Sequence, residues 1–235
     1  MNSTTSVIKK IEKDEKFFPE SSEKETVNFL KSLIILIQPK NVLEIGTFLG
    51  YSTCAIADGL TSKALLSTID EKDYFLKYYQ LLPKHIQQKI KIIKKQSKDY
   101  LLNLKKDVKF DLIFIDASHD YLSVFSDFFL SLQHTQKESI FIFHDSLADG
   151  VSRVLKCIKI ANCFSAHKTI NLIEFPTPEK PEIAKLKKMN QIPKKLSCIS
   201  GIAIVKISKN TFYPIFYLIL STIYRLNNIF LKKIK

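Results

Sequence analysis

The sequence has 235 residues, 46% of them hydrophobic, which suits one α/β domain with a large core. Its formal net charge is +13, yet every basic residue except Arg153 and Arg225 is a lysine. Readers of nucleic-acid bases depend on arginine for bidentate contacts, so the composition argues against that class. We interpret the lysines as a solvated surface; attraction to acidic substrates or to an anionic membrane surface is the alternative.

Cysteine usage and the first residues indicate the compartment. The four cysteines are scattered and form neither a paired metal motif nor a small disulfide framework. The first residues contain no apolar signal segment. We therefore expect a cytoplasmic protein.

The chain begins with a polar segment, residues 1–22, which we expect to be loosely ordered. Glu23–Ile37 then has the apolar spacing of a helix, and Pro39 ends it. Residues 41–53, NVLEIGTFLGYST, predict a strand, a tight turn and a helix start. Gly46 allows backbone angles that a side chain would forbid, and Gly50 would leave the helix start open to a ligand. The unpaired N–H groups of a helix start favour an anionic ligand group.

Beyond this turn, strands and helices alternate. Short apolar runs predict strands at Ala64–Ile69, Ile90–Ile93, Asp111–Ile115 and Ser139–Phe143. Helical spacing falls between and after them, at Gly50–Gly59, Asp73–Leu82, Lys98–Lys105, Tyr121–His134 and Gly150–Cys163. This alternation predicts a Rossmann-like α/β fold with a parallel sheet and helices on both faces.

The pattern changes after the last of these helices. Thr169–Phe175 and Ser200–Ile207 are strand-like runs with no helical pattern between them. Residues 176–197, which join them, carry four prolines and six lysines, and we interpret them either as a lid over the substrate or as a surface loop.

The last residues, 211–235, predict an amphipathic helix. Phe212–Tyr224 contains no charge but is too short to cross a membrane. An apolar stripe should contain Ile215, Leu218, Ile219, Thr222, Leu226, Ile229 and Phe230. We expect this helix to dock on an anionic membrane interface, on its own domain or on a second subunit. The chain thus divides into 1–22, a main domain at 23–210 and this helix.

Two acids connect the opening turn to a known family. Glu44 lies in an apolar strand two residues before Gly46, and Asp70 ends the next apolar run. Glu-x-Gly-x-x-x-Gly followed by this acid resembles class I S-adenosylmethionine-dependent methyltransferases. The resemblance implies that the two late strands close the sheet as an antiparallel pair. It also implies S-adenosylmethionine as cofactor, bound by Glu44, Gly46, Thr47, Gly50, Tyr51, Ser52, Asp70, Gln96, Ser97 and Asp116.

Polar residues follow the later strands, where ligands bind to open parallel sheets. Ile-Asp116-x-x-His119-x-Tyr121 and His144-Asp145 resemble the small-molecule O-methyltransferases of the catechol and caffeoyl-CoA type and of the sugar and macrolide type. The resemblance implies methylation of a small-molecule or sugar hydroxyl, with His119 as the general base beside Asp116. It also implies a divalent metal held by Asp116, His144 and Asp145, although relatives with a metal usually have a carboxylate in place of His144. Histidine suits transition metals better than magnesium, so the site is either altered in its metal preference or metal-free.

Other functions remain open. His119 could simply cap the following helix or bond a carboxylate. The positive charge favours a nucleic-acid methyltransferase, but the fourth strand lacks the Asn/Asp-Pro-Pro-aromatic signature of amino-group methylation. A nicotinamide-dependent oxidoreductase would share the sheet, but the middle glycine of its turn is missing. A non-catalytic cofactor-binding protein is the third alternative.

Overall fold

A computed structural model describes residues 3–17, 21–165, 169–176, 201–211 and 213–234. The fold is built on one seven-stranded sheet of order β3-β2-β1-β4-β5-β7-β6. Its strands are β1 (Asn41–Ile45), β2 (Leu65–Asp70), β3 (Ile90–Lys94), β4 (Phe110–Ile115), β5 (Thr135–His144), β6 (Ile170–Pro176) and β7 (Gly201–Ser208). The first five are mutually parallel, and β7 runs antiparallel to both β5 and β6. The predicted Rossmann-like fold with an antiparallel end is confirmed.

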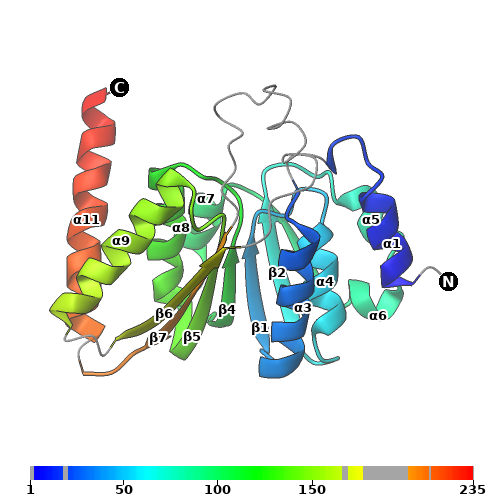
Figure 1. Cartoon of the computed structure of the whole chain (residues 1–235), viewed down its shortest axis with the longest axis horizontal. Coiled ribbons are helices and arrows are strands. Elements are labelled where there is room, and N and C mark those ends of the chain that lie inside the picture. The colour runs from blue at the N-terminus through cyan, green and yellow to red at the C-terminus, as the bar shows by residue number, and fades with distance from the viewer. Residues whose placement is uncertain (1–2, 18–20, 166–168, 177–200, 212, 235) are drawn as a thin grey trace.

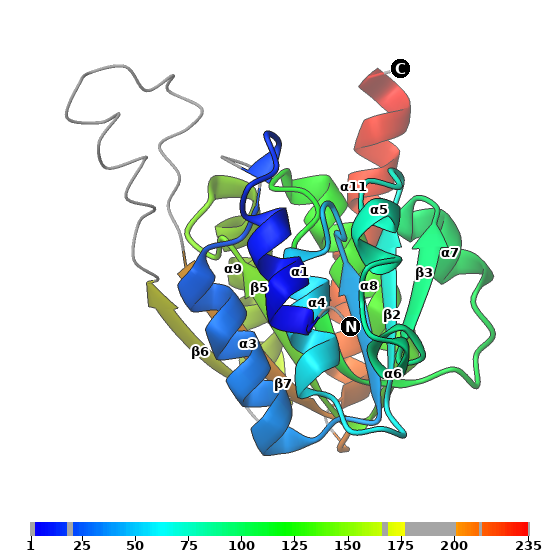
Figure 2. The same cartoon turned by 90° about the vertical axis from the view of Figure 1, so that its right-hand side faces the viewer.

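Helices cover both faces of this sheet (Figure 1). They are α1 (Thr4–Ile11), α3 (Lys24–Ile37), α4 (Tyr51–Gly59), α5 (Leu76–Tyr79), α6 (Lys84–Gln87), α7 (Ser97–Asn103), α8 (Tyr121–Ser131), α9 (Asp149–Phe164) and α11 (Tyr213–Ile234), with a 3₁₀ turn at Leu132–His134. Successive side chains of a strand point to opposite faces of the sheet, so each strand contributes to the core on both faces. In β4, Ile113 and Ile115 pack toward α8 and α9, and Leu112 and Phe114 pack toward α3 and α4. Figure 2 shows α1, α3 and α4 together over the second face.

The first residues differ from the prediction of a loose segment. Helix α1 is capped by Ser3, whose side chain accepts a hydrogen bond from the Ser6 N–H, and it packs on α4. Val7 and Ile11 are fully buried there. The apolar spacing of this short helix was obscured by the lysines around it, and burial of one stripe is what orders it.

Other boundaries also shift. The helix expected at Asp73–Leu82 is only the single turn α5, followed after Pro83 by α6. Strand β5 begins at Thr135, four residues before the expected start, because Thr135 pairs with Phe110 of β4 and Glu138 pairs with Ser208 of β7. The connection at 176–197, interpreted as a lid or a surface loop, lies outside the described residues except for Pro176.

The C-terminal helix α11 packs on α8 and α9 of its own domain. Phe216 and Leu220 are fully buried, and Tyr217 and Tyr224 stack on Phe129 of α8. The predicted apolar stripe mostly faces away from the domain: its exposed members are Ile215, Leu218, Leu226 and Ile229. The aromatic face is therefore the one that docks, since aromatic side chains bury the larger area. No helix among the described residues is long and apolar enough to cross a membrane.

A buried carboxyl group joins β1, β2 and α4. Glu44 is completely buried and accepts hydrogen bonds from the hydroxyls of Ser52, Thr53 and Thr68, each at 2.6 Å. Burial raises the pKa of Glu44 to about 7, although the three hydroxyls oppose that shift. The carboxyl group thus holds the strand and the following helix together below the turn.

This raised pKa predicts a dependence of stability on pH. The folded chain binds the Glu44 proton more tightly than the unfolded chain, so this contribution to stability is complete below the unfolded pKa of 4.5 and is lost as pH rises through about 7. In Glu44→Gln the loss should disappear, so that the variant gains up to about 3 kcal/mol relative to the parent between pH 4.5 and 8. Urea unfolding across this range measures the difference. The exposed Glu15→Gln should follow the parent, and a constant gap between parent and Glu44→Gln would contradict the assignment.

Candidate active site

The carboxyl ends of β1 to β4 surround a cavity of about 350 Å³. Its size lies within the range of small-molecule sites. Four of the predicted residues line it: Gly46, Asp70, Ser97 and Asp116. The remaining walls come from Ile45, Phe48, Ile69, Glu71, Lys72, Lys95, Ala117, Ser118, Ser123 and Asp127.

The two glycines of the opening turn are required for different structural reasons. Gly46 has φ +103°, and a Cβ there would lie 2.5 Å from the backbone oxygen of Asp116. Gly46 therefore allows the turn after β1 to approach the end of β4. Gly50 has φ +82°, but the ring of Phe75 occupies the space beside it, 2.0 Å from where a Cβ would be. The glycine therefore makes room for a core aromatic ring, and its predicted role in leaving the helix start open to a ligand stays a prediction.

Asp70 supports this turn from the neighbouring strand. Its Oδ2 accepts hydrogen bonds from the backbone N–H groups of Thr47, at 3.1 Å, and Phe48, at 2.7 Å. Its Oδ1 accepts one from the N–H of Lys72 at 2.8 Å. The carboxylate thus lines the cavity and holds the turn in place.

The other predicted cofactor residues lie farther from the main cavity. Thr47, Tyr51 and Ser52 line a smaller adjoining hollow of about 30 Å³, together with Ser21, Ser22 and Asp116. Glu44 lies below the turn, with its oxygens bonded to hydroxyls. Gln96 is the N-cap residue of α7 and is not among the described residues that line either space.

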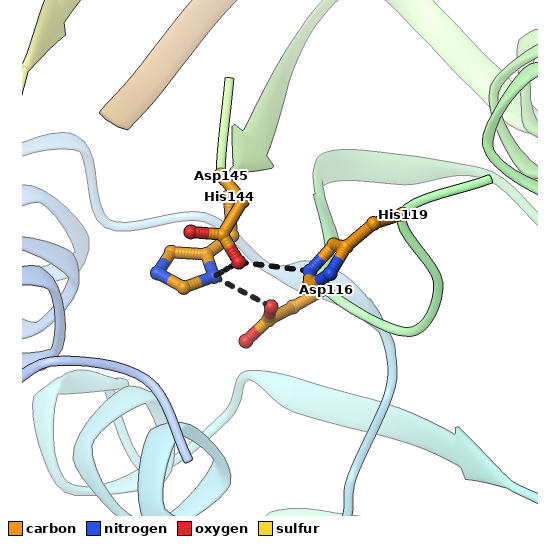
Figure 3. A group of neighbouring side chains, drawn as sticks. All are labelled: Asp116, His119, His144 and Asp145. Atoms are coloured by element: carbon orange, nitrogen blue, oxygen red, sulfur yellow. Dashed lines mark ion pairs between the residues drawn. The ribbon is translucent and has the colours of Figure 1, made fainter. Parts of the chain in front are cut away.

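A second group of side chains meets at the same edge (Figure 3). His144 is buried, and its Nδ1 lies 2.7 Å from Oδ1 of Asp116 and 3.3 Å from Oδ2 of Asp145. His119 reaches the group from the loop after β4, with Nε2 2.8 Å from Oδ2 of Asp145. The structure therefore brings together the four residues predicted for catalysis and metal binding.

The backbone at Asp145 makes this arrangement possible. Consecutive side chains of a strand point to opposite faces, which would separate His144 from Asp145. Asp145 has φ +48°, in the left-handed region that residues other than glycine seldom adopt. This turn returns the carboxylate to the side of the His144 ring, as Figure 3 shows. Such backbone strain is commonly found at functional sites.

Two residues of this group were missed in the sequence. Oε2 of Glu23 lies 2.7 Å from Nε2 of His144, and the hydroxyl of Ser22 donates to Oδ2 of Asp116 at 2.7 Å. Both precede α3, far from the strands in sequence. Neither belongs to a motif, so only the folded chain reveals their place.

The charges around His144 determine its protonation. Burial alone would lower the pKa of His144, but Asp116, Asp145 and Glu23 outweigh burial and hold that pKa well above its ordinary value. Burial would likewise raise the pKa of Asp145, but His119 and His144 hold it below its usual range. Without a metal, these carboxylates therefore favour the protonated form of the ring.

The same atoms also fit a metal ion. Nδ1 of His144 is buried and close to two carboxylate oxygens, yet it has no hydrogen bond of good geometry among the described residues. Asp116, His119, His144 and Asp145 each offer one ligand atom, and these atoms all lie within 4.8 Å of one another. Glu23 can hold the proton on Nε2 and leave Nδ1 free to ligate, as carboxylates do behind metal-binding histidines. The mixture of nitrogen and oxygen donors favours a transition metal over magnesium.

His119 is half-exposed and is oriented by Asp145. The hydrogen bond to Asp145 raises the pKa of His119 above its ordinary value, more strongly than burial lowers it. Asp116, which the sequence placed beside this base, contacts His144 and Ser22 instead. Since Asp145 holds Nε2, Nδ1 is the nitrogen left to accept a proton.

A third missed residue, Asp127 of α8, lies in the wall of the main cavity. Its side chain is nearly completely buried, and Ser97 of α7 donates a hydrogen bond to its Oδ1 at 2.5 Å. Burial raises the pKa of Asp127 to about 7. The sequence did contain a sign of this residue, because Asp127 lies within the apolar pattern of Val124, Phe125 and Phe128. A carboxyl group is costly to bury, so an acid in such a pattern indicates a specific role.

Comparison with known proteins finds that this chain is similar to methyltransferases. Residues 43–146 match the family described as "Methyltransferase domain". Catechol O-methyltransferase B of Danio rerio is 25% identical over 142 residues, which are 58% of this chain and 54% of that protein. O-methyltransferase hkm8 of Aspergillus hancockii is 28% identical over 120 residues, 50% of this chain and 47% of that protein. The matched regions thus span about half the length of these curated relatives.

A solved structure agrees over a longer region. The O-methyltransferase TomG of Streptomyces achromogenes, crystallised with S-adenosylmethionine, matches with a TM-score of 0.64 and 16% identity. The match covers 88% of this chain and 91% of that one. The fold is that of the class I, Rossmann-like methyltransferases, and the matched region is similar to their methyltransferase domain. Within that class the chain is similar to O-methyltransferases, and the resemblance predicted from the sequence is confirmed.

The contact between His119 and Asp145 can be tested without a substrate. Asp145→Asn removes the negative charge that stabilises the imidazolium, so the pKa of His119 should fall toward its ordinary value. NMR titration of the His119 ring would follow this change. Asp149→Asn, at a well-exposed acid, is the matched control. An unchanged titration of His119 in Asp145→Asn would show that Asp145 does not orient the ring.

Proposed function

We propose that the protein transfers a methyl group from S-adenosylmethionine to a hydroxyl group of a small molecule or sugar. One observation carries this proposal: Asp116 both lines the main cavity and contacts His144. A ligand in the cavity would thus lie directly beside the group of acids and histidines. The O-methyltransferase relatives support the same reaction and favour neither the nucleic-acid methyltransferase nor the nicotinamide oxidoreductase.

The cofactor would lie along the carboxyl ends of the strands. Its ribose would lie near Asp70 and the turn at Gly46, and its charged amino-acid end would lie near Ser22, Thr47 and Asp116. Ser97 would be at the other end, beside the base. This direction points the methyl group toward His119.

The reaction itself is an in-line displacement. The acceptor oxygen attacks the methyl carbon, the bond from carbon to sulfur breaks, and S-adenosylhomocysteine leaves as a neutral thioether. The acceptor proton passes to Nδ1 of His119, whose other nitrogen is held by Asp145. The remaining contribution of the protein is alignment of oxygen, carbon and sulfur.

A divalent metal, if bound, would be held by Asp116, His144 and Asp145. It would supply a positive charge that makes the acceptor hydroxyl a stronger acid. In its absence, the His144 imidazolium places a positive charge at the same point. His119 lies close enough to join the ligand set, which would remove it as a base. The assignment of His119 therefore needs its own test.

Replacement of His119 provides that test. His119→Ala should retain its affinity for S-adenosylhomocysteine, measured by calorimetry, and should lose transfer activity by roughly 10²–10⁴-fold, the usual contribution of a general base. A panel of catechols, phenols and sugars with radiolabelled S-adenosylmethionine would supply the acceptor. His85→Ala, at an exposed histidine of α6, should keep full activity. Full turnover by His119→Ala would refute the catalytic assignment, and no binding of S-adenosylhomocysteine to the parent would refute the proposed function.

We further propose that the outer face of α11 contacts an anionic membrane surface. This face presents Ile215, Leu218, Leu226 and Ile229, each at least 46% exposed. No acidic residue occurs after Glu182, whereas lysines are frequent up to the end of the chain. An aliphatic stripe among positive charges suits an interface with acidic headgroups. Such contact would bring the enzyme to membrane-associated acceptors.

Flotation with vesicles tests this contact. The parent should float with vesicles containing phosphatidylserine and should remain below with vesicles of phosphatidylcholine alone. Leu218→Ser combined with Leu226→Ser should lose flotation without unfolding, because both side chains are exposed. Leu36→Ser, on the exposed side of α3, is the control. Equal behaviour of all variants, or loss of a dimer in place of loss of flotation, would contradict the membrane contact.

A further inference from the structure

One end of the main cavity contains chemistry that the methyl transfer does not use. Asp127 of α8 is 3% exposed, and it lines the cavity together with Ser123, one turn earlier on the same helix, and Ser97 of α7. A buried acid with a single hydroxyl partner normally costs stability, so its position at a cavity wall needs an explanation.

The hydrogen bond to Ser97 fixes the direction of this acid. The Ser97 hydroxyl donates to Oδ1, which makes Oδ1 the carbonyl-like oxygen when the group is neutral. Oδ2 would then carry the proton. A neutral carboxyl group held in this way offers one acceptor and one donor side by side.

The edge of adenine that bears its amino group is complementary to this pair. The 6-amino group donates a hydrogen bond and the adjacent N1 accepts one, so both could bond to one neutral carboxyl group. We propose that Asp127, oriented by Ser97, recognises the amino-purine edge of the cofactor. This inference rests on the proposed function, and it assigns a specificity residue to the end of the cavity.

The surroundings of Asp127 support the neutral form. Burial is the main cause that raises its pKa to about 7, and the charge of Asp120 on the same helix adds to the shift. The other charged groups that line the cavity are of both signs: Asp70, Glu71, Lys72, Lys95 and Asp116. Near neutral pH the acid can therefore be protonated, while a carboxylate would only accept hydrogen bonds.

Three variants separate recognition from a structural role. Asp127→Asn keeps a donor beside an acceptor, so it should bind S-adenosylhomocysteine about as well as the parent does at pH 6.5. Asp127→Leu keeps the size and removes both groups, so its affinity should fall about tenfold or more. Asp99→Leu, at an exposed acid of α7, should bind like the parent. Calorimetry gives the affinities, and melting temperatures without ligand show whether each variant is folded.

Two further readouts address the base directly. Between pH 6 and 8.5 the parent should lose affinity as Asp127 ionises, while Asp127→Asn should lose less. The 6-deamino analogue of S-adenosylhomocysteine should bind the parent more weakly than the natural compound does, while Asp127→Leu should not distinguish the two.

The outcomes are distinct. Equal affinity of parent and Asp127→Leu, parallel pH profiles of parent and Asp127→Asn, or equal discrimination of the analogue by parent and Asp127→Leu would each overturn the role of Asp127 and leave the methyltransferase proposal intact. Failure of the parent to bind S-adenosylhomocysteine would overturn both.

Discussion

The burial of one histidine among three carboxylates is the constraint on which the site depends. His144 is almost inaccessible to solvent and contacts Glu23, Asp116 and Asp145. A buried charge must be paired, and removing one partner from such a group is strongly destabilising. The carboxyl ends of β4 and β5 and the segment before α3 therefore have to meet at one point. His119 is added through Asp145, so the geometry of the candidate base depends on the same contacts.

A second buried acid fixes the neighbouring part of the sheet. Glu44 bonds to hydroxyls from α4 and β2, and above it Asp70 holds the backbone of the turn. The two acids have different partners, hydroxyls for one and backbone N–H groups for the other. Together they keep the turn after β1 close to the end of β4, where Gly46 leaves room for the contact. The turn after β1 and the end of β4 thus separate the cavity from the histidine cluster, and hydrogen bonds hold both in place.

The order of strands and helices could be predicted because each strand is a short apolar run and each helix has its own spacing. The edge of the sheet that carries the site follows from parallel strands, which placed Asp116, His119, His144 and Asp145 together. Partners contributed by distant segments could not be predicted. Glu23 and Ser22 reach the site only because α3 packs beside α4, and Asp127 reaches the cavity through the orientation of α8. The contact of Gly50 with Phe75 could not be predicted either, because the ring of Phe75 comes from a part of the chain that lies beyond the next strand.

Helix α8 lines the main cavity with one side and packs on α11 with another. Ser123 and Asp127 line the cavity on one side, while Phe125 and Phe129 stack against Tyr224 of α11 on another, where Asn227 also donates to the Tyr121 hydroxyl. A displacement of α11 would therefore be transmitted to the wall of the cavity through helix α8. Whatever binds the outer face of the C-terminal helix can therefore act on the main cavity through two packed helices, without touching the cavity itself.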